Sequence, residues 1–286
     1  MDVLRTLLKV SRPAGWCFGP TLYAIGAIHG RGSARAPSLS LLLQLLSLSF
    51  PLALVVFGVN DVYDYFTDVH NPRKVADGLE GTVLPPTYHS PVILSACLAS
   101  LCILVCSSFT GRTQNFVVTL PLLVLAWQYS APPFRLKERP VFDSLSNGAI
   151  VVLAYLSGYT ALGGSLRHIP PKGLVLGLCT AGVHALGAAV DAEADAAAGQ
   201  HTIATALGQR GAVLFATLCY VAAVLAERNF SVFGVYLLGG LLMMVFPLVD
   251  VSRTHLAFRL VVCWTVGMSA LWFADKALRL RRAKNG

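Results

Sequence analysis

Long apolar runs separated by short polar stretches recur along the whole chain. As helices, most of these runs are long enough to cross a hydrocarbon core of ~30 Å. We expect about nine such spans, near residues 14–29, 39–60, 91–109, 116–130, 144–163, 173–190, 210–226, 232–248 and 256–275. The pattern predicts an all-α polytopic membrane protein whose helices form one bundle.

Glycine, proline and asparagine fall between these spans, where turns are needed. The breaks run from Gly30 to Pro37, Asn71 to Pro86, Pro132 to Pro140, Gly163 to Pro171, and Gly199 to Gly211. A length of 286 residues suits a single domain over residues 1–286, with no room for a separate soluble domain.

Two polar stretches at the ends of apolar spans have an unusual spacing. Asn60, Asp64 and Asp68 follow one another at i, i+4 and i+8, which on a helix confines them to a stripe about 80° wide. Asp191 and Asp195 repeat the i, i+4 spacing. We name these sets the first and the second acidic ladder. Both are expected at helix ends.

The order of the spans predicts that the two ladders share one membrane face. If the helices alternate in direction, the second, fourth and sixth spans all end on the side that holds the N-terminus. The stretch from Tyr129 to Lys137 closes the fourth span on that side. Ten of the fourteen acidic residues belong to the three loops there: Asp61, Asp64, Asp68, Asp77, Glu80, Glu138, Asp143, Asp191, Glu193 and Asp195.

Composition and charge support this membrane assignment and suggest its orientation. The chain is 55% hydrophobic, with a mean hydropathy of +0.65 and a net charge of +8. This balance favours contact with anionic lipid headgroups and argues against nucleic acid as a partner. Without the C-terminal tail, the side holding the N-terminus has eleven Lys and Arg residues against six opposite, which predicts that it faces the cytosol. The five basic residues of the tail fall on the opposite side in this arrangement, so the orientation rests on the earlier loops.

Carboxylate ladders at a membrane face indicate a bound divalent cation, because otherwise the charges repel one another. Mg²⁺ shared between carboxylates and phosphate oxygens would suit a substrate that carries a diphosphate. If the leaving group is allylic, an apolar bundle would shield the carbocation from water. Four basic residues are candidates to hold the diphosphate: Arg73, Lys74, Arg135 and Lys137. Four aromatic rings are candidates to stabilise the cation: Tyr63, Tyr65, Tyr129 and Tyr155.

Both ladders, together with Ser11-Arg12-Pro13 and Tyr129-Ser130-Ala131-Pro132-Pro133, resemble the UbiA superfamily of intramembrane prenyltransferases. The resemblance covers residues 11 to about 211. It implies nine helices around a central cavity that opens to the bilayer, and Mg²⁺-dependent transfer of a prenyl group from an allylic diphosphate to a lipophilic acceptor. It also implies that Asn60, Asp64, Asp68, Asp191 and Asp195 form the catalytic site, and that the four aspartates bind the metal.

The sequences of several loops most resemble the lycopene elongase branch, whose members add C5 units to the ends of a linear carotenoid. The matching segments are Gly58 to Tyr65, Asn71 to Lys74, Leu79 to Leu84, Phe134-Arg135, Arg139 to Gly148, and Gly182 to Ala185.

The chain departs from the superfamily pattern in two places. It has Ala196-Ala197-Ala198 where many members have a basic residue after the second ladder, and Pro133 where others have a lysine. The nearest basic substitutes are Arg73, Lys74, Arg135 and Lys137.

Several functions share some of these features. A terpene cyclase of the same architecture begins with the same ionisation, and so does an aromatic or quinone-precursor prenyltransferase. A transporter would place acidic groups near the bilayer midplane, whereas here they cluster at span ends. A CDP-alcohol phosphotransferase would need an Asp-Gly-x-x-Ala-Arg string, which does not follow Asp61 and Asp64. The donor length, the acceptor, the oligomeric state, the organelle and the side of the C-terminal tail stay open.

Overall fold

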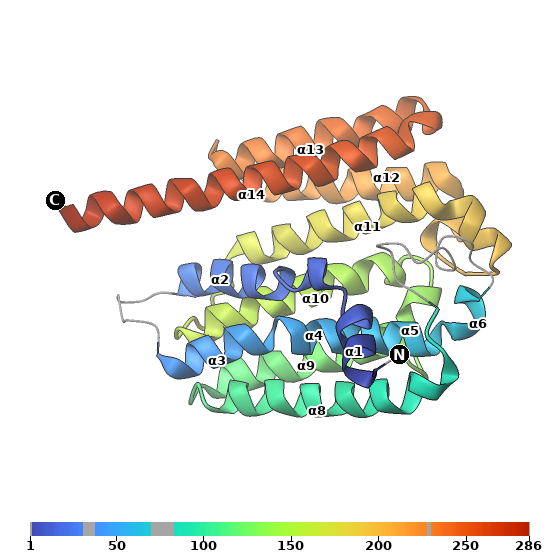
Figure 1. The fold of residues 1–286 in the computed structure, drawn as a ribbon. Coiled ribbons are helices and arrows are strands. Elements are labelled where there is room, and N and C mark those ends of the chain that lie inside the picture. The colour runs from blue at the N-terminus through green and yellow to red at the C-terminus, as the bar shows by residue number, and fades with distance from the viewer. Residues whose placement is uncertain (1, 31–37, 70–82, 228–229, 286) are drawn as a thin grey trace. The chain divides into compact units, whose positions relative to one another are not determined.

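A computed structural model describes residues 2–30, 38–69, 83–227 and 230–285 (Figure 1). Every regular element in these ranges is helical. The helices are α1 (Val3–Val10), α2 (Phe18–Gly30), α3 (Leu39–Ser47), α4 (Phe50–Ala53), α5 (Val59–Tyr63), α6 (Tyr65–Asp68), α8 (His89–Ser108), α9 (Thr113–Ser130), α10 (Phe142–Ala161), α11 (Pro171–Ala197), α12 (Ile203–Ala226), α13 (Val232–Val249) and α14 (Thr254–Asn285).

The helices follow the pattern of apolar runs, so the prediction of an all-α protein is confirmed. Each of the nine expected ranges overlaps a helix. Among the described residues, six stretches are long and apolar enough to cross a membrane by length and composition. They are Leu39–Tyr63, Pro86–Ser108, Pro171–Ala197, Ile203–Ala226, Val232–Val249 and Val251–Arg279. The number of nine spans stays a prediction.

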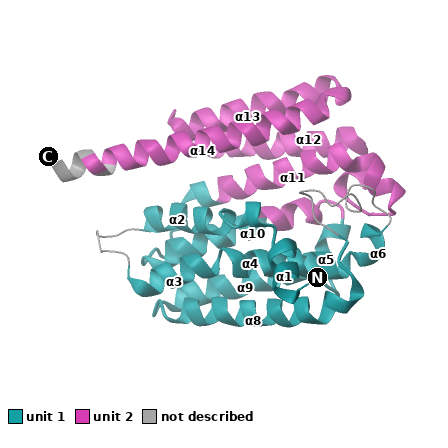
Figure 2. Ribbon diagram, in the orientation of Figure 1, with its two compact units in different colours: residues 1–139, 149–173 teal, residues 140–148, 174–286 magenta. Residues whose placement is uncertain are grey.

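The chain divides into two compact units (Figure 2). Unit 1 comprises residues 1–139 and 149–173, and unit 2 comprises residues 140–148 and 174–286. The chain passes from one unit to the other just before α10, again within α10, and a third time near the start of α11.

Unit 1 is built around the helices that precede and follow the first acidic ladder. Its core contains Val55 and Val59 before the ladder, Val92 and Ala96 of α8, and Ala126 of α9. Val10, at the end of α1, is 1% exposed and belongs to the same core. The core therefore fixes the helix that ends in the ladder against the helix that ends at Ser130.

Two glycines let α2 and α10 cross almost backbone to backbone inside unit 1. A Cβ built on Gly26 would lie 1.9 Å from the carbonyl oxygen of Tyr155, and one on Gly158 would lie 1.9 Å from that of Tyr23. Neither distance is possible between real atoms. Only a residue without a side chain therefore fits on either side of this crossing.

A buried polar cluster ties five helices of unit 1 together near this crossing. Gln44 of α3 accepts a bond from Tyr23 (3.1 Å) and donates one to Asn115 of α9 (2.7 Å). Asn115 in turn accepts from Ser107 of α8 and donates to the carbonyl oxygen of Ser157 of α10. Because water cannot supply these bonds within a bilayer, the side chains satisfy one another.

Unit 2 consists of α11 to α14 and the first turns of α10. Its core is formed by apolar faces of these helices, including Leu186 of α11, Tyr220 of α12, Met244 of α13 and Val261 of α14. The chain folds back between α12 and α13 and again between α13 and α14, and the successive helices pack against each other.

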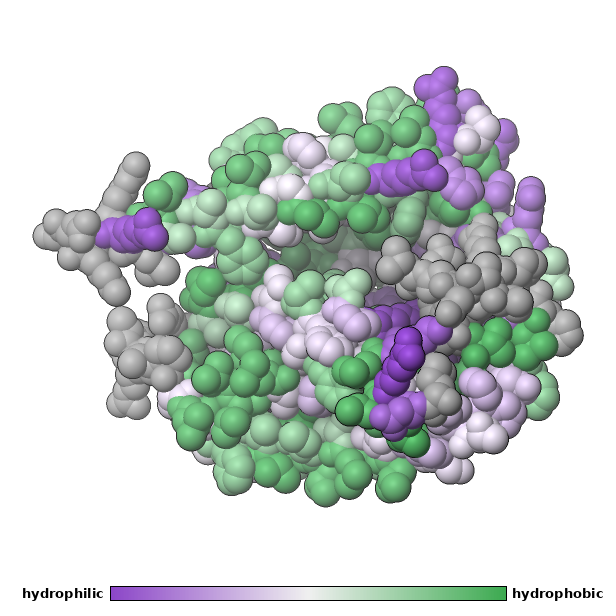
Figure 3. All heavy atoms as spheres, viewed as in Figure 1, coloured by the Kyte–Doolittle hydropathy of each residue, from purple (hydrophilic) through white to green (hydrophobic). Residues whose placement is uncertain are grey.

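The face of the molecule seen in Figure 3 is apolar over most of its helices. Hydrophobic residues cover most of the visible helix surface, and strongly hydrophilic ones gather toward helix ends. Leucines such as Leu94, Leu98 and Leu101 on α8 are about 60% exposed. In water such a surface would be unfavourable, whereas lipid tails solvate it.

Candidate active site

The first acidic ladder lies at the end of an irregular helix. A π-helical turn at Leu54–Gly58 leads directly into α5. Asp64 then separates α5 from α6, with φ −97° and ψ 0°. The bonds from the Asp64 N–H to the Asn60 carbonyl (2.9 Å) and from the Asp68 N–H to the Asp64 carbonyl (2.8 Å) continue across the break. The i, i+4, i+8 relation predicted for the ladder is therefore kept in the backbone.

Buried carboxylates are the main feature of this ladder. Asp64 is 6% exposed and Asp68 is 2% exposed, and Asp61 beside them is fully buried. A buried carboxylate is stable only with cations or hydrogen-bond donors close to it.

Two basic residues from the stretch after α9 reach the first ladder. The Lys137 ammonium contacts Oδ1 of Asp64 and lies 3.4 Å from Oδ1 of Asn60. The Arg135 guanidinium is 3.9 Å from the same Asp64 oxygen and also pairs with Glu138. The backbone of Arg135 adopts a left-handed conformation (φ 42°), which L-residues rarely adopt unless the surroundings hold them there. The expected approach of this stretch to the first ladder is thus observed within unit 1.

Arg12, which follows α1, supplies a third cation. Its guanidinium donates to Oδ1 of Asp61 at 2.9 Å and lies over the ring of Phe57, 4.7 Å from the centroid. Arg12 also has a left-handed backbone (φ 51°). The Ser130 hydroxyl, at the end of α9, donates to Oδ1 of Asn60 at 3.1 Å.

Lys137 is the cation most affected by burial. Desolvation lowers the pKa of its ammonium to about 8, and the negative charges of Glu138 and Asp61 oppose that shift only in part. An ammonium that is poorly solvated gains more from an anion than a solvated one does. A further negative partner would therefore stabilise the Lys137 ammonium.

The second acidic ladder lies at the end of α11 in unit 2. Asp191 and Asp195 are half-buried, whereas Glu193, which the helix turns to the other face, is exposed. The Thr202 hydroxyl donates to Oδ2 of Asp195 at 3.4 Å. Gly199 ends the helical stretch with φ 70°, which turns the chain toward α12.

Asp143 belongs to the same group of acidic loop residues, but the structure gives it a different place. Its carboxylate is fully buried and accepts from the backbone N–H of Ser144 and from that of Ile203, each at 2.7 Å. Ile203 is the first residue of α12. Asp143 therefore satisfies the start of a helix from a distant part of the chain, which is a structural role.

A model of the UbiA prenyltransferase family matches residues 18–273, which is most of the chain. This protein belongs to the UbiA prenyltransferase family. It is therefore a prenyltransferase and an integral, multi-pass membrane protein.

Two relatives and one solved structure show the extent of the similarity. A lycopene elongase/hydratase from Haloarcula japonica is 35% identical over 244 residues, which cover 82% of this chain and 79% of that protein. A lycopene elongase/hydratase from Halobacterium salinarum is 32% identical over 285 residues, 94% of each chain. A UbiA homologue from Archaeoglobus fulgidus, solved with DMAPP and Mg²⁺, shares the fold with a TM-score of 0.66 at 20% identity, covering 92% of this chain and 99% of that one.

The structure describes some of the remaining predicted site residues of this UbiA-family chain and not others. Arg73 and Lys74 lie outside the described residues. Tyr129 is half-buried at the end of α9. Tyr155 is fully buried within α10, and its hydroxyl lies 2.8 Å from Nδ1 of His29 of α2.

Arg12 and Ser130 were not assigned roles from the sequence, although both stand in the motifs that resemble the family. Their contacts join residues 49 and 70 positions apart. The only signal for Arg12 in the sequence is a basic residue before a proline at the end of an amphipathic segment.

The ladder side chains offer carboxylate and amide oxygens, which suit a hard cation such as Mg²⁺. Among the described residues, no group of three or more His, Cys, Asp or Glu side chains is arranged to hold a metal. In unit 1 the Lys137 ammonium instead contacts the oxygens of Asp64 and Asn60. A positive charge thus already lies where the resemblance expects a cation.

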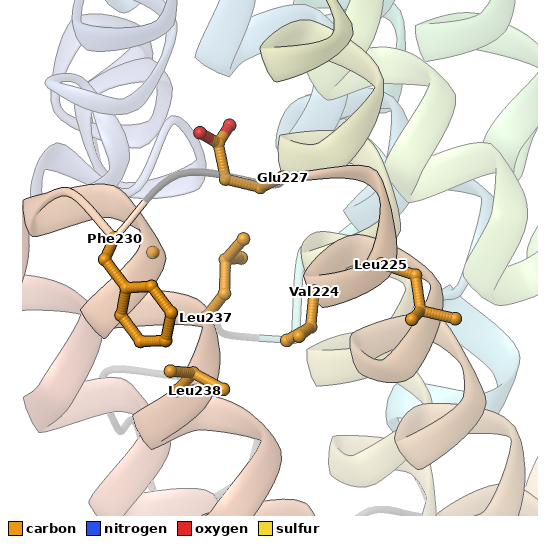
Figure 4. Close-up of a pocket in the computed structure, with 7 residues that line it drawn as sticks. Val224, Leu225, Glu227, Phe230, Leu237 and Leu238 are labelled. Carbon is orange, nitrogen blue, oxygen red and sulfur yellow. The ribbon is translucent and has the colours of Figure 1, made fainter.

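Two surface cavities are lined by residues outside the ladders. One of about 490 Å³ is at the far end of α12 in unit 2, lined by Val224, Leu225, Glu227, Phe230, Gly234, Leu237 and Leu238 (Figure 4). The other, of about 320 Å³, lies in unit 1 at the start of α9 and the end of α10. Neither is lined by a ladder residue, so neither supports the expected substrate site.

Replacing Arg12 with alanine should weaken unit 1, because it leaves Asp61 buried without its guanidinium partner. We expect a loss of about 2 kcal/mol in the free energy of unfolding, reduced from the value for a fully buried pair because Arg12 is partly exposed. Denaturation of the purified protein in detergent measures it. In an Arg12→Ala/Asp61→Asn double variant, part of the loss should be recovered, and a double variant no better than the single one would contradict this account.

Proposed function

We propose that this enzyme transfers a prenyl group from an allylic diphosphate of the DMAPP class to the end of a linear carotenoid such as lycopene. The observation that carries the proposal is the similarity to lycopene elongase/hydratases over nearly the full length of the chain. The UbiA homologue with DMAPP and Mg²⁺ shares the fold. An acceptor without polar groups also agrees with the apolar surface of the helices, through which it would enter from the bilayer.

In this proposal both acidic ladders act on the diphosphate. Asn60, Asp64 and Asp68 would bind Mg²⁺ and diphosphate together with Asp191 and Asp195. When bound, Mg²⁺ supplies positive charge that stabilises the departing diphosphate. The oxygen donors described above are of the kind that Mg²⁺ prefers.

Lys137 and Arg135 would serve as cations that exchange partners. With no substrate, they neutralise Asp64. When magnesium takes over that task, the two side chains become available to the diphosphate, as would Arg73 and Lys74. Burial already disfavours an isolated Lys137 ammonium, so the diphosphate is an attractive second partner for it. Tyr129 would line the region that binds the diphosphate.

The proposal also includes the orientation of the enzyme in the membrane. We propose that the ladders face the cytosol, as the distribution of basic residues indicates, and that the water-soluble donor enters from there while the acceptor comes from the lipid. Accessibility of a cysteine introduced at Glu193 to a membrane-impermeant thiol reagent, in sealed cells, tests this orientation. Labelling from outside would contradict it.

The activity is tested with purified protein, DMAPP or a longer allylic diphosphate, and lycopene, aromatic acids or no acceptor. We expect carotenoid products heavier by one or two C5 units, formed only with Mg²⁺. EDTA should stop product formation and excess Mg²⁺ should restore it. Cyclic hydrocarbons formed without an acceptor would identify a terpene cyclase instead, and activity in a metal-free preparation would exclude the role of the ladders.

A further inference from the structure

One face of α11 bears a histidine as well as the second acidic ladder. His184 precedes Asp191 by seven residues, which on an α-helix places the two side chains within about 20° of each other. Asp195 lies on the same stripe. His184 is about 10 Å nearer the middle of the helix than Asp191, at 1.5 Å per residue. The stripe thus leads from the helix end into the membrane-spanning part of α11.

An ionisable residue in that part of a helix is unfavourable unless it has a polar partner, and such residues often mark functional sites. One of its partners is Ser144 of α10, whose hydroxyl oxygen lies 3.1 Å from Nδ1 of His184. Ser144 is held in turn by its neighbour, because its backbone N–H donates to the buried carboxylate of Asp143. The imidazole is thereby oriented by a chain of hydrogen bonds within unit 2 that ends at the start of α12.

The proposed reaction requires a group that accepts a proton. The allylic C–O bond breaks and its electron pair leaves with the diphosphate. The terminal double bond of the carotenoid supplies the pair for the new C–C bond, which leaves a tertiary cation on the adjacent carbon. That cation either loses a proton from a neighbouring carbon to form a new double bond, or adds water, whose oxygen then loses a proton. Each outcome releases one proton, which must leave an apolar site.

We propose that His184 accepts this proton at Nε2, and that Ser144 positions the imidazole. This inference rests on the proposed function, since another acceptor would release its proton elsewhere. When Nδ1 donates its hydrogen to the Ser144 hydroxyl, Nε2 carries the lone pair that a base needs. The ladder carboxylates are less suited to the task, because the diphosphate and its metal engage them.

The position of His184 agrees with the length of the substrate. Asp191 and Asp195 would bind the diphosphate end, and the reacting carbons of the prenyl chain and the acceptor lie further into the membrane. A base on the same stripe, about two helical turns further into the membrane than the ladder, would therefore be near these carbons.

The test compares His184→Gln with His255→Gln in the full-length protein. Glutamine keeps a hydrogen-bond partner for Ser144 but accepts no proton, and His255 is an exposed histidine of α14 in the same unit. With lycopene, DMAPP and Mg²⁺, we expect carotenoid product to form roughly 100-fold more slowly in His184→Gln, with the KM for DMAPP unchanged and diphosphate release exceeding carotenoid product. His255→Gln should match the wild type. Ser144→Ala should lower kcat by roughly 10-fold without altering the KM for DMAPP.

A second variant distinguishes the loss of a proton acceptor from a loss of folding. In His184→Ala, added imidazole should restore carotenoid product if the missing group is a base. Product formation by His184→Gln at the wild-type rate would overturn the inference, and so would a His184→Ala variant that imidazole does not restore. A wild-type protein that forms no carotenoid product would instead overturn the proposed function itself.

Discussion

Replacing Asp64 or Asp191 with asparagine is expected to lower prenyl transfer by about 10³-fold or more, which corresponds to about 4 kcal/mol of transition-state stabilisation. Each substitution removes one negative charge from a ladder while keeping the size of the side chain. The loss should appear in kcat, because the charge matters most when the diphosphate departs. Initial rates of product formation with saturating Mg²⁺, lycopene and DMAPP measure it.

Glu193→Gln is the matched control for Asp191→Asn. Both residues lie near the end of α11, two positions apart, but Glu193 is on the exposed face. The control should retain the wild-type rate. Equal losses in both variants would mean that the charge of this helix end matters in general, without a ligand role for Asp191.

The double variant Asp64→Asn/Asp191→Asn tests whether the two ladders serve one reaction step. Groups that act as a unit on one transition state give losses that do not multiply, because the first substitution already removes most of the benefit of the second. We expect the double variant to be no more than about 10-fold slower than the slower single variant. Fully multiplicative losses would indicate two independent sites.

The course of the helices could be predicted from the sequence because it depends on local patterns. The apolar runs placed the spans, and glycine and proline placed the breaks between them. The i, i+4 spacing of the two ladders is local as well, so it predicted that Asn60, Asp64 and Asp68 share one stripe, and the bonds across Asp64 preserve it.

The partners of the ladder residues could not be predicted in this way, since they come from distant parts of the chain. Arg12 reaches Asp61 from the turn after α1, and Ser130 reaches Asn60 from the end of α9. Asp143 shows the opposite case. By composition it resembled the acidic residues of the site, but its carboxylate holds the start of α12, and only the contact with Ile203 distinguishes it from a ligand.

Sequence patterns gave no sign of the crossing between α2 and α10 either, because glycine is common in membrane helices for several reasons. The structure singles out Gly26 and Gly158, where each backbone faces a carbonyl oxygen of the other helix. A side chain at either position is therefore expected to destabilise the protein.

Gly26→Ala or Gly158→Ala should destabilise the protein by about 3 kcal/mol or more, because the added methyl group would overlap backbone atoms that no rotamer change can move. The two helices would have to separate, and the nearby bonds among Tyr23, Gln44 and Asn115 would lengthen with them. We expect a lower midpoint of thermal denaturation in detergent and a smaller monodisperse fraction after purification.

Gly267→Ala provides the matched control. Gly267 lies inside α14, and a Cβ there would meet no heavy atom within 4 Å. Alanine favours a helix by roughly 0.5–1 kcal/mol relative to glycine, so the control should be as stable as the wild type or slightly more so. If Gly26→Ala and Gly267→Ala behaved alike, the close crossing would not limit stability. A loss confined to Gly26 and Gly158 would show that the backbone contact between α2 and α10 holds unit 1 together.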